Sequence, residues 1–231
     1  MTFMRIGEKP EIARLPLFRD MDDAMRERIF AGSFLQVFPP QLVLFELGQH
    51  ADFLHVLVDG LVELSATSGG RDTTMRIVEP ITSFILAAVV NDLPYLMTAR
   101  TLEPSRVLLV PAALIREVIR QDAALMQATM HELALAYRDL VRALADMKLR
   151  QSAERLGNYL LQQEGQQAAA GTIHLRAEKR VLASLLGMTP ENLSRAFSML
   201  ANHGVRVNGG KITIIDRNAL CKFARPDPIP V

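Results

Sequence analysis

Residues 181–195 read VLASLLGMTPENLSR, and this stretch predicts two helices joined by a tight turn. Ala183 is small where the two helices must approach each other, and Gly187 can supply the positive φ that such a turn requires. Thr189 can cap the second helix, and Pro190 suits its first position because the N–H that proline lacks has no helical partner there. The stretch therefore predicts a helix-turn-helix.

The neighbouring residues predict a wing and a basic surface. We expect the first helix over 177–186, the second over 190–203 and a β-hairpin over 205–215 that turns at 208–210. Residues 176–225 hold nine Arg or Lys against three Asp or Glu, a balance of about +6, whereas the whole chain carries +1. A basic end is typical of a nucleic-acid-binding module, although an ordinary solvated surface can give the same count.

The second helix presents polar residues near its N-terminal end, which helix-turn-helix proteins insert into the major groove. The predicted DNA-binding residues are Thr189, Glu191, Asn192, Ser194 and Arg195 on this helix, with Arg206 and Lys211 in the wing. Arg195 can donate two hydrogen bonds to guanine, Glu191 can accept one from the cytosine amine, and Ser194 can contact a neighbouring thymine. Capping of the first helical turn is the structural alternative for Glu191.

The region from Phe34 to Val110 predicts a closed antiparallel β-roll, because short β-rich runs alternate there with Gly, Pro, Asp and Ser turn signals. The runs cover residues 42–45, 53–58, 61–64, 75–78 and 106–110. Asp59-Gly60 lies between two of them and predicts a hairpin, and the Ser-Gly-Gly sequence at 68–70 marks the next turn. The 33 residues before this region are expected to form short helices.

After Pro111 the pattern is continuously helical to about Gln163, with no proline and with Gly157 as the only glycine. Within it, apolar residues recur at alternating spacings of four and three, the repeat of a coiled-coil seam. The seam residues are Met126, Met130, Leu133, Tyr137, Leu140, Leu144 and Met147. A long helix that joins two modules has little of its own chain to cover this stripe, so we expect a parallel homodimer, with packing on its own domain as the alternative.

The composition argues against several classes of protein. Cys221 is the only cysteine, which excludes an intramolecular disulfide and any zinc site or iron–sulfur cluster built from several cysteines of one chain. The longest apolar run, residues 84–90, is far shorter than the roughly 20 residues that cross a bilayer, so we expect a soluble, cytoplasmic protein with no membrane partner. No phosphate-binding Gly-rich loop, His-Glu-x-x-His motif or nucleophile elbow occurs, so we expect no enzyme.

Over nearly its whole length the chain resembles the cyclic AMP receptor protein/FNR family of transcription regulators. Glu191, Ser194 and Arg195 match the Glu-x-x-Ser-Arg pattern of the FNR-type recognition helix, and residues 189–200 are similar to the regulators of nitrogen-oxide respiration. The resemblance implies an α+β protein with an N-terminal antiparallel β-roll of the cyclic-nucleotide-binding jelly-roll type, a long dimerisation helix and a C-terminal winged helix-turn-helix. The implied domains are residues 1–120, 121–148 and 149–231.

The same resemblance implies a function. It suggests a homodimer that binds double-stranded promoter DNA at an inverted repeat with the half-site TTGAT, and that contacts RNA polymerase if it activates transcription. Pro190 stands where relatives have arginine or valine, which leaves the outermost base of the half-site open. The alternative is a sensor or interaction module whose terminal domain binds protein rather than DNA, without ligand control. Salt-dependent binding to duplex DNA would distinguish the two.

The expected sensor departs from the cyclic-nucleotide binders of this family. Those proteins carry a Gly-Glu element followed by Arg-Ser or Arg-Thr, because a buried phosphate needs an arginine and the ribose needs a carboxylate. Here residues 82–90 read TSFILAAVV and residues 93–99 read LPYLMTA, with neither Glu nor Arg. We therefore expect no binding of cyclic AMP or GMP, unless Arg100 reaches in from the next strand. FNR's own cluster is excluded by the missing N-terminal cysteines.

An apolar cavity with an unknown occupant is expected in the sensor, lined by Phe84, Leu86, Val89, Tyr95, Leu96 or Met97. Relatives with degenerate pockets sense nitric oxide or carbon monoxide through haem. The axial candidates in this chain are His50, His55, His131 and the methionines. The other interpretation is that the cavity is filled core and that the protein is regulated by its abundance.

Overall fold

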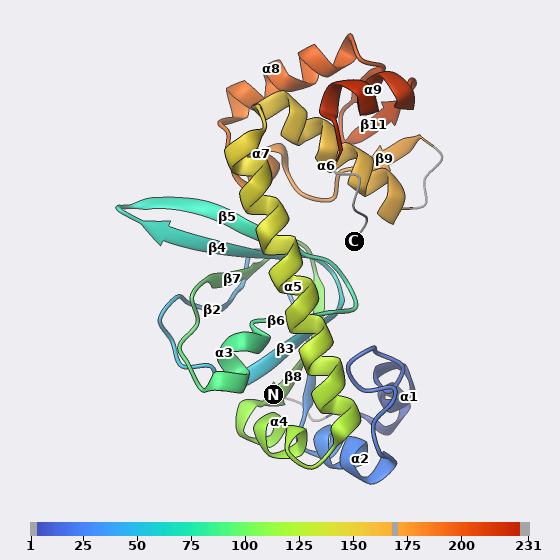
Figure 1. The fold of residues 1–231 in the computed structure, drawn as a ribbon. Coiled ribbons are helices and arrows are strands. Elements are labelled where there is room, and N and C mark those ends of the chain that lie inside the picture. The colour runs from blue at the N-terminus through green and yellow to red at the C-terminus, as the bar shows by residue number, and fades with distance from the viewer. Residues whose placement is uncertain (1–3, 168–170, 227–231) are drawn as a thin grey trace. The chain divides into compact units, whose positions relative to one another are not determined.

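The computed structural model describes residues 4–167 and 171–226. The chain divides into two compact units, an N-terminal unit of residues 1–139 and a C-terminal unit of residues 140–231. The division falls inside the long helix α5 (Ala123–Leu149), so this helix belongs to both units (Figure 1). Within the described ranges, no helix is both long enough and apolar enough to cross a membrane.

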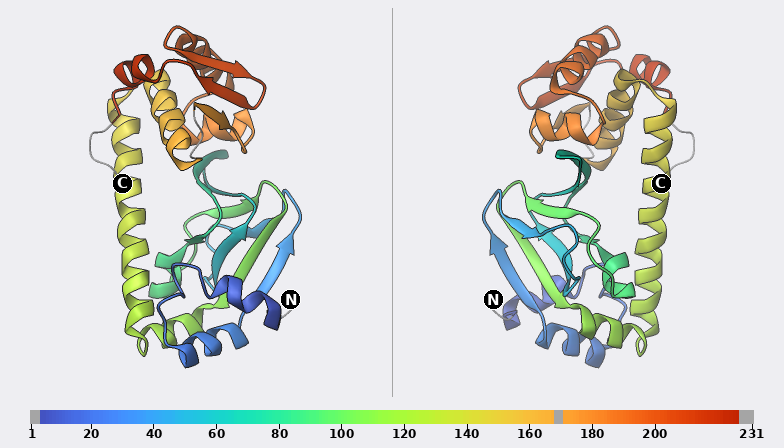
Figure 2. Two further views of the ribbon diagram at one scale, coloured as in Figure 1. Left: turned by 90° about the vertical axis from the view of Figure 1, so that its right-hand side faces the viewer. Right: turned by 90° about the vertical axis from the view of Figure 1, so that its left-hand side faces the viewer.

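The N-terminal unit begins with the expected short helices, η1 (Ile6–Glu8), α1 (Lys9–Ile12) and α2 (Asp23–Ala31). α2 starts after Asp22, whose carboxylate accepts hydrogen bonds from two backbone N–H groups of the first turn. The backbone N–H of Asp22 in turn donates to the carboxylate of Asp122, just before α5, at 2.9 Å. α2 also lies beside α4 (Ala112–Ile119), as Figure 2 shows. These contacts fix the N-terminal helices against the start of α5.

Two four-stranded antiparallel sheets form the jelly roll, which confirms the expected fold class. One sheet has the order β1-β8-β3-β6 and the other the order β2-β7-β4-β5. Buried side chains from both sheets, such as Leu54 and Val62, share one hydrophobic cluster. The strands are β1 (Phe34–Phe38), β2 (Val43–Phe45), β3 (Phe53–Asp59), β4 (Val62–Ser68), β5 (Arg71–Val78), β6 (Thr82–Phe84), β7 (Thr98–Thr101) and β8 (Ser105–Pro111). The short helix α3 (Leu86–Asn91) follows β6.

The hairpin expected at Asp59-Gly60 is wrong. β3 and β4, on either side of this dipeptide, belong to different sheets, so the chain crosses from one sheet to the other here. Gly60 has a φ of 105°, and a Cβ at this position would lie 2.5 Å from the Cα of Ser105. The Ser105 hydroxyl accepts a hydrogen bond from the backbone N–H of Leu61 at 3.2 Å. Glycine is therefore required by a close crossing of two chain segments rather than by a hairpin turn.

The uninterrupted helix expected from Pro111 to Gln163 is also wrong, because three helices occupy this region. α4 ends at Ile119, α5 begins at Ala123, and α6 (Ser152–Gln166) follows a second break. At the first break the Asp122 carboxylate accepts a hydrogen bond from the N–H of Leu125 at 2.8 Å, which caps α5. At the second, the N–H of Gln151 donates to the Glu154 carboxylate at 2.8 Å. Both breaks are fixed by polar caps that leave the apolar periodicity intact.

The C-terminal unit is a winged helix-turn-helix. Its elements after α6 are β9 (Thr172–His174), α7 (Lys179–Leu185), α8 (Pro190–Ala201), β10 (Val205–Asn208), β11 (Lys211–Ile214) and α9 (Arg217–Ala224). The three strands form one antiparallel sheet in the order β10-β11-β9. Leu160 of α6, Leu200 of α8 and Ile212 of β11 are fully buried in a common core. The expected wing turn lies between β10 and β11, where Gly209 has a φ of 61°.

Candidate nucleic-acid interface and sensor interior

The turn between α7 and α8 has the geometry that the sequence predicts. Gly187 adopts a φ of 62°, and the N–H of Met188 donates to the carbonyl of Ala183 at 2.9 Å, which closes the turn. Ala183 is fully buried where the helices meet. Thr189 caps α8 by accepting a hydrogen bond from the N–H of Asn192 at 3.2 Å. The direction of α8 is therefore set by residues of the turn itself.

The outer face of α8 carries the predicted DNA-reading residues. Glu191, Ser194 and Arg195 are all exposed, as are Thr189 and Asn192 at the start of the helix. The opposite face of α8 carries the buried side chains of Leu193, Ala196, Phe197 and Leu200. Because the apolar face is fixed in the core, the polar face is presented outward along a helix of 12 residues. The structure thus brings the three predicted reading residues together on one accessible surface.

Glu191 makes hydrogen bonds at the start of α8, which is the capping role that the sequence left open as an alternative. The pKa of its carboxyl lies below the ordinary value, first because its own backbone N–H donates to it, and also because of the Thr189 hydroxyl and the positive charge of Arg195. The carboxylate is fully exposed, so these contacts do not remove it from solvent. Glu191 is consequently ionised at neutral pH and sits beside Arg195 at the N-terminal end of α8.

Other basic residues of the C-terminal unit are exposed on α7 and on the wing. Arg206 on β10 and Lys211 on β11 are exposed on the wing, as the sequence predicts. Sequence reasoning did not single out Lys179 and Arg180, which are exposed at the start of α7. The ammonium group of Lys179 lies 5.9 Å from the centre of the Phe197 ring on α8. The charge count over residues 176–225 included both residues, and it was the signal that could have identified them.

The predicted seam follows one side of α5 and is largely uncovered in the single chain. Six of its seven residues are 44–68% exposed, namely Met126, Met130, Tyr137, Leu140, Leu144 and Met147. Leu133 differs, because it is partly buried against the hydrophobic cluster of the roll. The buried residues Leu125 and Thr129 lie on the side of α5 that faces the roll. The helix therefore has one side covered by its own domain and another, apolar side that is largely exposed, apart from Leu133.

Most of the residues expected to line an effector cavity belong to the packed core. Phe84, Leu86, Val89 and Tyr95 are buried in the same cluster, and Met97 packs against it. The ring of Phe45 stacks on Tyr95 at 3.9 Å between centroids and on Phe84 at 6.2 Å. Burial raises the pKa of Tyr95 to about 12, and its hydroxyl donates to the carbonyl of Phe53. The aromatic side chains fill the space that the sequence assigned to an occupant.

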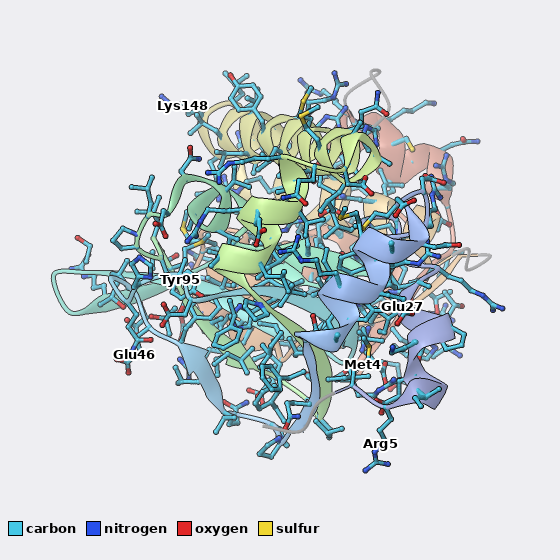
Figure 3. All side chains as sticks on the ribbon, turned by 90° about the horizontal axis from the view of Figure 1, so that it is seen from below. Met4, Arg5, Glu27, Glu46, Tyr95 and Lys148 are labelled. Carbon is cyan, nitrogen blue, oxygen red and sulfur yellow. The ribbon has the colours of Figure 1, made fainter. Side chains whose placement is uncertain are left out.

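Leu96 was expected to line the cavity, and this expectation is wrong, because the residue is 79% exposed. The N–H of Tyr95 donates to the carbonyl of Gln49, and the N–H of Gly48 donates to the carbonyl of Tyr95. This pairing turns Tyr95 inward and leaves the next residue outside. Figure 3 shows Tyr95 and Glu46 on the same side of the N-terminal unit. A cavity of about 350 Å³ lies elsewhere, lined by Pro10, Glu11, Arg14, Leu15, Val58 and Ile81.

The three histidines named as haem candidates lie in different surroundings. His50 is on the surface, where its ring nitrogens lie 3.0 Å from Asp52 and 3.4 Å from Asp92. His131 is exposed on α5. His55 is buried, and its ring centroid lies 4.8 Å from that of Phe45 and 5.4 Å from that of Phe84, so packed rings occupy the space in which a porphyrin would have to lie. Burial lowers the pKa of His55 to about 4, which keeps this imidazole neutral.

Arg100, the arginine that the sequence left open as a phosphate partner, lies on the opposite face of β7 from the fully buried side chains. On β7, Ala99 and Thr101 are fully buried, and Arg100 between them points to the opposite face because side chains alternate along a strand. It pairs in register with Glu63 on β4. The segment that corresponds to the nucleotide-binding element is β6 and α3, whose buried residues include Phe84, Leu86 and Val89. None of the buried residues of β6 and α3 is an arginine or an acidic residue.

Comparison with known protein families assigns both units. The model of the cyclic nucleotide-binding domain matches residues 35–122, and the model of the Crp-like helix-turn-helix domain matches residues 154–223. The two matches follow one another in this order and together span the roll and the winged helix. The chain belongs to the cyclic AMP receptor protein/FNR family of transcription regulators.

Solved structures of this family share the fold. FixK2 from Bradyrhizobium japonicum has a TM-score of 0.74 and 20% identity, with 86% of this chain and 99% of that chain covered. A CooA mutant from Carboxydothermus hydrogenoformans has a TM-score of 0.72 and 15% identity, covering 88% and 90%. CLP from Xanthomonas campestris, described as a c-di-GMP responsive global regulator, has a TM-score of 0.71 and 16% identity, covering 84% and 100%. No curated protein sequence matches the chain.

Proposed function

We propose that the protein is a non-enzymatic, homodimeric transcription regulator that reads an inverted repeat with FNR-type half-sites, TTGAT, in promoter DNA. The observation that carries the proposal is the exposed row of Glu191, Ser194 and Arg195 on α8, which the buried opposite face and the Gly187 turn hold outward. Arg195 would donate to guanine O6 and N7, and Glu191 would accept from the amine of the paired cytosine. RNA polymerase is a further partner if the protein activates transcription.

The acidic residue favours base reading over general DNA affinity. Glu191 is ionised and exposed at the end of α8, where a carboxylate near phosphates is repelled. A surface that only bound the DNA backbone would gain by having a neutral or basic residue there. The basic residues Lys179 on α7 and Arg206 and Lys211 on the wing are exposed, and we propose that they supply the phosphate contacts. Their contribution depends on salt, whereas the base contacts depend on sequence.

Dimerisation is supported by the uncovered stripe on α5. Exposed apolar side chains at six of the seven seam positions are costly for a single chain in water, and a second α5 in parallel would bury them in knobs-into-holes packing. A two-fold dimer also places two copies of α8 for two half-sites about one helical turn apart. We propose further that the effector is not a cyclic nucleotide, because β6 and α3 offer no charged partner for a phosphate.

Selection from a pool of random DNA duplexes tests the proposal. We expect enrichment of an inverted repeat whose half-sites contain a central G·C pair. Arg195→Ala should weaken binding to the selected site by about 1–3 kcal/mol and flatten the preference at that pair. Arg206→Ala is the matched control, since loss of this wing arginine should weaken all sequences equally and reduce the salt dependence. Half-sites without a central G·C pair, or binding insensitive to salt, would contradict the assignment.

A further inference from the structure

The cavity of about 350 Å³ in the N-terminal unit lies where α1 meets the roll, away from the aromatic interior. Its lining residues come from α1 and the turn after it, from the end of β3 and from the position just before β6. They are Pro10, Glu11, Arg14, Leu15, Val58 and Ile81. Leu15 and Val58 are buried and form an apolar floor. Arg14 and Ile81 are exposed, so the cavity opens to solvent beside them.

Ile81 stands at the opening of this cavity in an unfavourable backbone conformation. Its φ is 65°, a left-handed value at which the Cβ of a β-branched residue crowds the backbone. The backbone N–H of Ile81 donates to the carbonyl of Leu57 at 2.8 Å, which holds the conformation. The side chain is 57% exposed, so burial in the core does not offset the strain. Strained residues of this kind gather at ligand sites, and an isoleucine here gives the cavity an apolar wall.

Two charged side chains line the cavity, and they differ in their partners. The Glu11 carboxylate accepts two hydrogen bonds from the guanidinium group of Arg106 on β8, at 3.2 and 2.8 Å. Glu8 and Asp59 also act on Arg106, and neither of these carboxylates lines the cavity. The side chain of Arg14 has no hydrogen bond or ion pair within residues 4–167 and 171–226. Among the lining groups the negative charge is therefore paired, and the positive charge of Arg14 is available to a ligand.

We propose that this cavity binds a small carboxylate with an aromatic or branched apolar body. The apolar body would pack on Leu15, Val58 and Ile81, and the carboxylate would accept two hydrogen bonds from Arg14, whose planar fork of donors matches it. Ligand sites have volumes of about 300–1,000 Å³, and a cavity at the lower end of this range suits a ligand of about ten non-hydrogen atoms. The site lies apart from α8, and its ligand takes no part in the proposed contacts with DNA.

Methyl NMR of the full-length protein, labelled at Ile, Leu and Val, tests the site directly. Phenylacetate is the probe, and phenylacetamide is a neutral control of nearly the same shape. We expect the methyl signals of Leu15, Val58 and Ile81 to shift saturably with phenylacetate, with a dissociation constant below about 1 mM. Phenylacetamide should bind about tenfold more weakly, because a hydrogen bond to a charged group contributes about this factor. Ile212, buried in the C-terminal unit, should not shift. No saturable shift, or equal affinity for both compounds, would overturn the proposal.

Variants separate the charged contact from the apolar one. Arg14→Gln should weaken phenylacetate binding about tenfold and leave phenylacetamide binding unchanged. Arg19→Gln is the matched control, since Arg19 is exposed nearby but does not line the cavity, and it should bind as the wild type does. Ile81→Asn should weaken both compounds several-fold, read from Leu15 and Val58, without loss of stability in the unliganded protein.

Unchanged phenylacetate binding by Arg14→Gln, or unchanged binding of both compounds by Ile81→Asn, would overturn the assignment of the site. None of these measurements uses DNA, so the outcome is independent of the proposed DNA-binding function.

Discussion

Replacing Leu140 by glutamate tests the proposed dimer seam most directly. Leu140 is 59% exposed in the single chain and lies in the middle of the uncovered stripe. Full burial of a leucine side chain stabilises by about 1.5–3 kcal/mol, so covering the exposed part gains about 1–2 kcal/mol for each protomer. A symmetric pair therefore contributes about 2–4 kcal/mol to dimerisation, which corresponds to at least about a thirtyfold change in the dissociation constant. Two facing carboxylates add a repulsive cost to this loss.

Sedimentation velocity over a range of protein concentrations is the measurement. We expect the wild type to sediment as a dimer and Leu140→Glu to sediment as a monomer at the same concentrations. Leu149→Glu is the matched control, because Leu149 is 82% exposed on the same helix but falls at the f position of the heptad, away from the seam. The same substitution there should leave the dimer intact. A Leu140→Glu protein that remains folded and dimeric would refute the seam.

Three further predictions concern the N-terminal unit. Cyclic AMP should give no binding heat in calorimetry, and micromolar or tighter binding would contradict the proposed absence of a phosphate partner. Burial lowers the pKa of His55 in the folded protein to about 4, from an ordinary value of 6.5. The unfolded chain therefore binds a proton at this histidine more tightly than the folded protein does. The free energy of unfolding should consequently fall by about 3 kcal/mol as the pH drops from about 6.5 to about 4. Urea unfolding at several pH values should show that His55→Phe loses this dependence, whereas an unchanged profile would rule out His55 as its source. Ile81 has a φ of 65°, a left-handed conformation that strains a β-branched residue, and it is 57% exposed. Ile81→Asn should therefore stabilise the fold by about 1 kcal/mol in the same assay at neutral pH, because asparagine tolerates this region, and lower stability would contradict the strain.

The sequence predicted the helix-turn-helix well because its signals are local. The positive φ of Gly187 and the cap made by Thr189 depend on residues within a few positions, and both are found in the structure. The outward face of α8 follows from the spacing of its buried residues, which helical geometry fixes. Local chemistry was therefore enough to place Glu191, Ser194 and Arg195 together, although their contacts with bases stay a prediction.

The sequence predictions failed where a residue far along the chain decides between two structures that the local sequence allows equally. A glycine with positive φ fits a hairpin as well as a crossing between sheets, and at Gly60 the choice is made by Ser105, 45 positions later in the sequence. Asp122 lies inside the stretch that the sequence predicts to be one helix, yet its carboxylate caps α5 and also accepts a hydrogen bond from the N–H of Asp22, which is 100 positions away. Such contacts have no signature in periodicity, because the apolar pattern on either side continues unchanged.

The interior of the roll shows the same limit. The missing arginine and glutamate predict that no phosphate is buried here, and this stays a prediction, because an absent ligand set does not reveal what occupies the space. The structure fills it with the rings of Phe45, Phe84 and Tyr95 around a neutral His55. A packed interior of this kind has no room for a large effector without rearrangement.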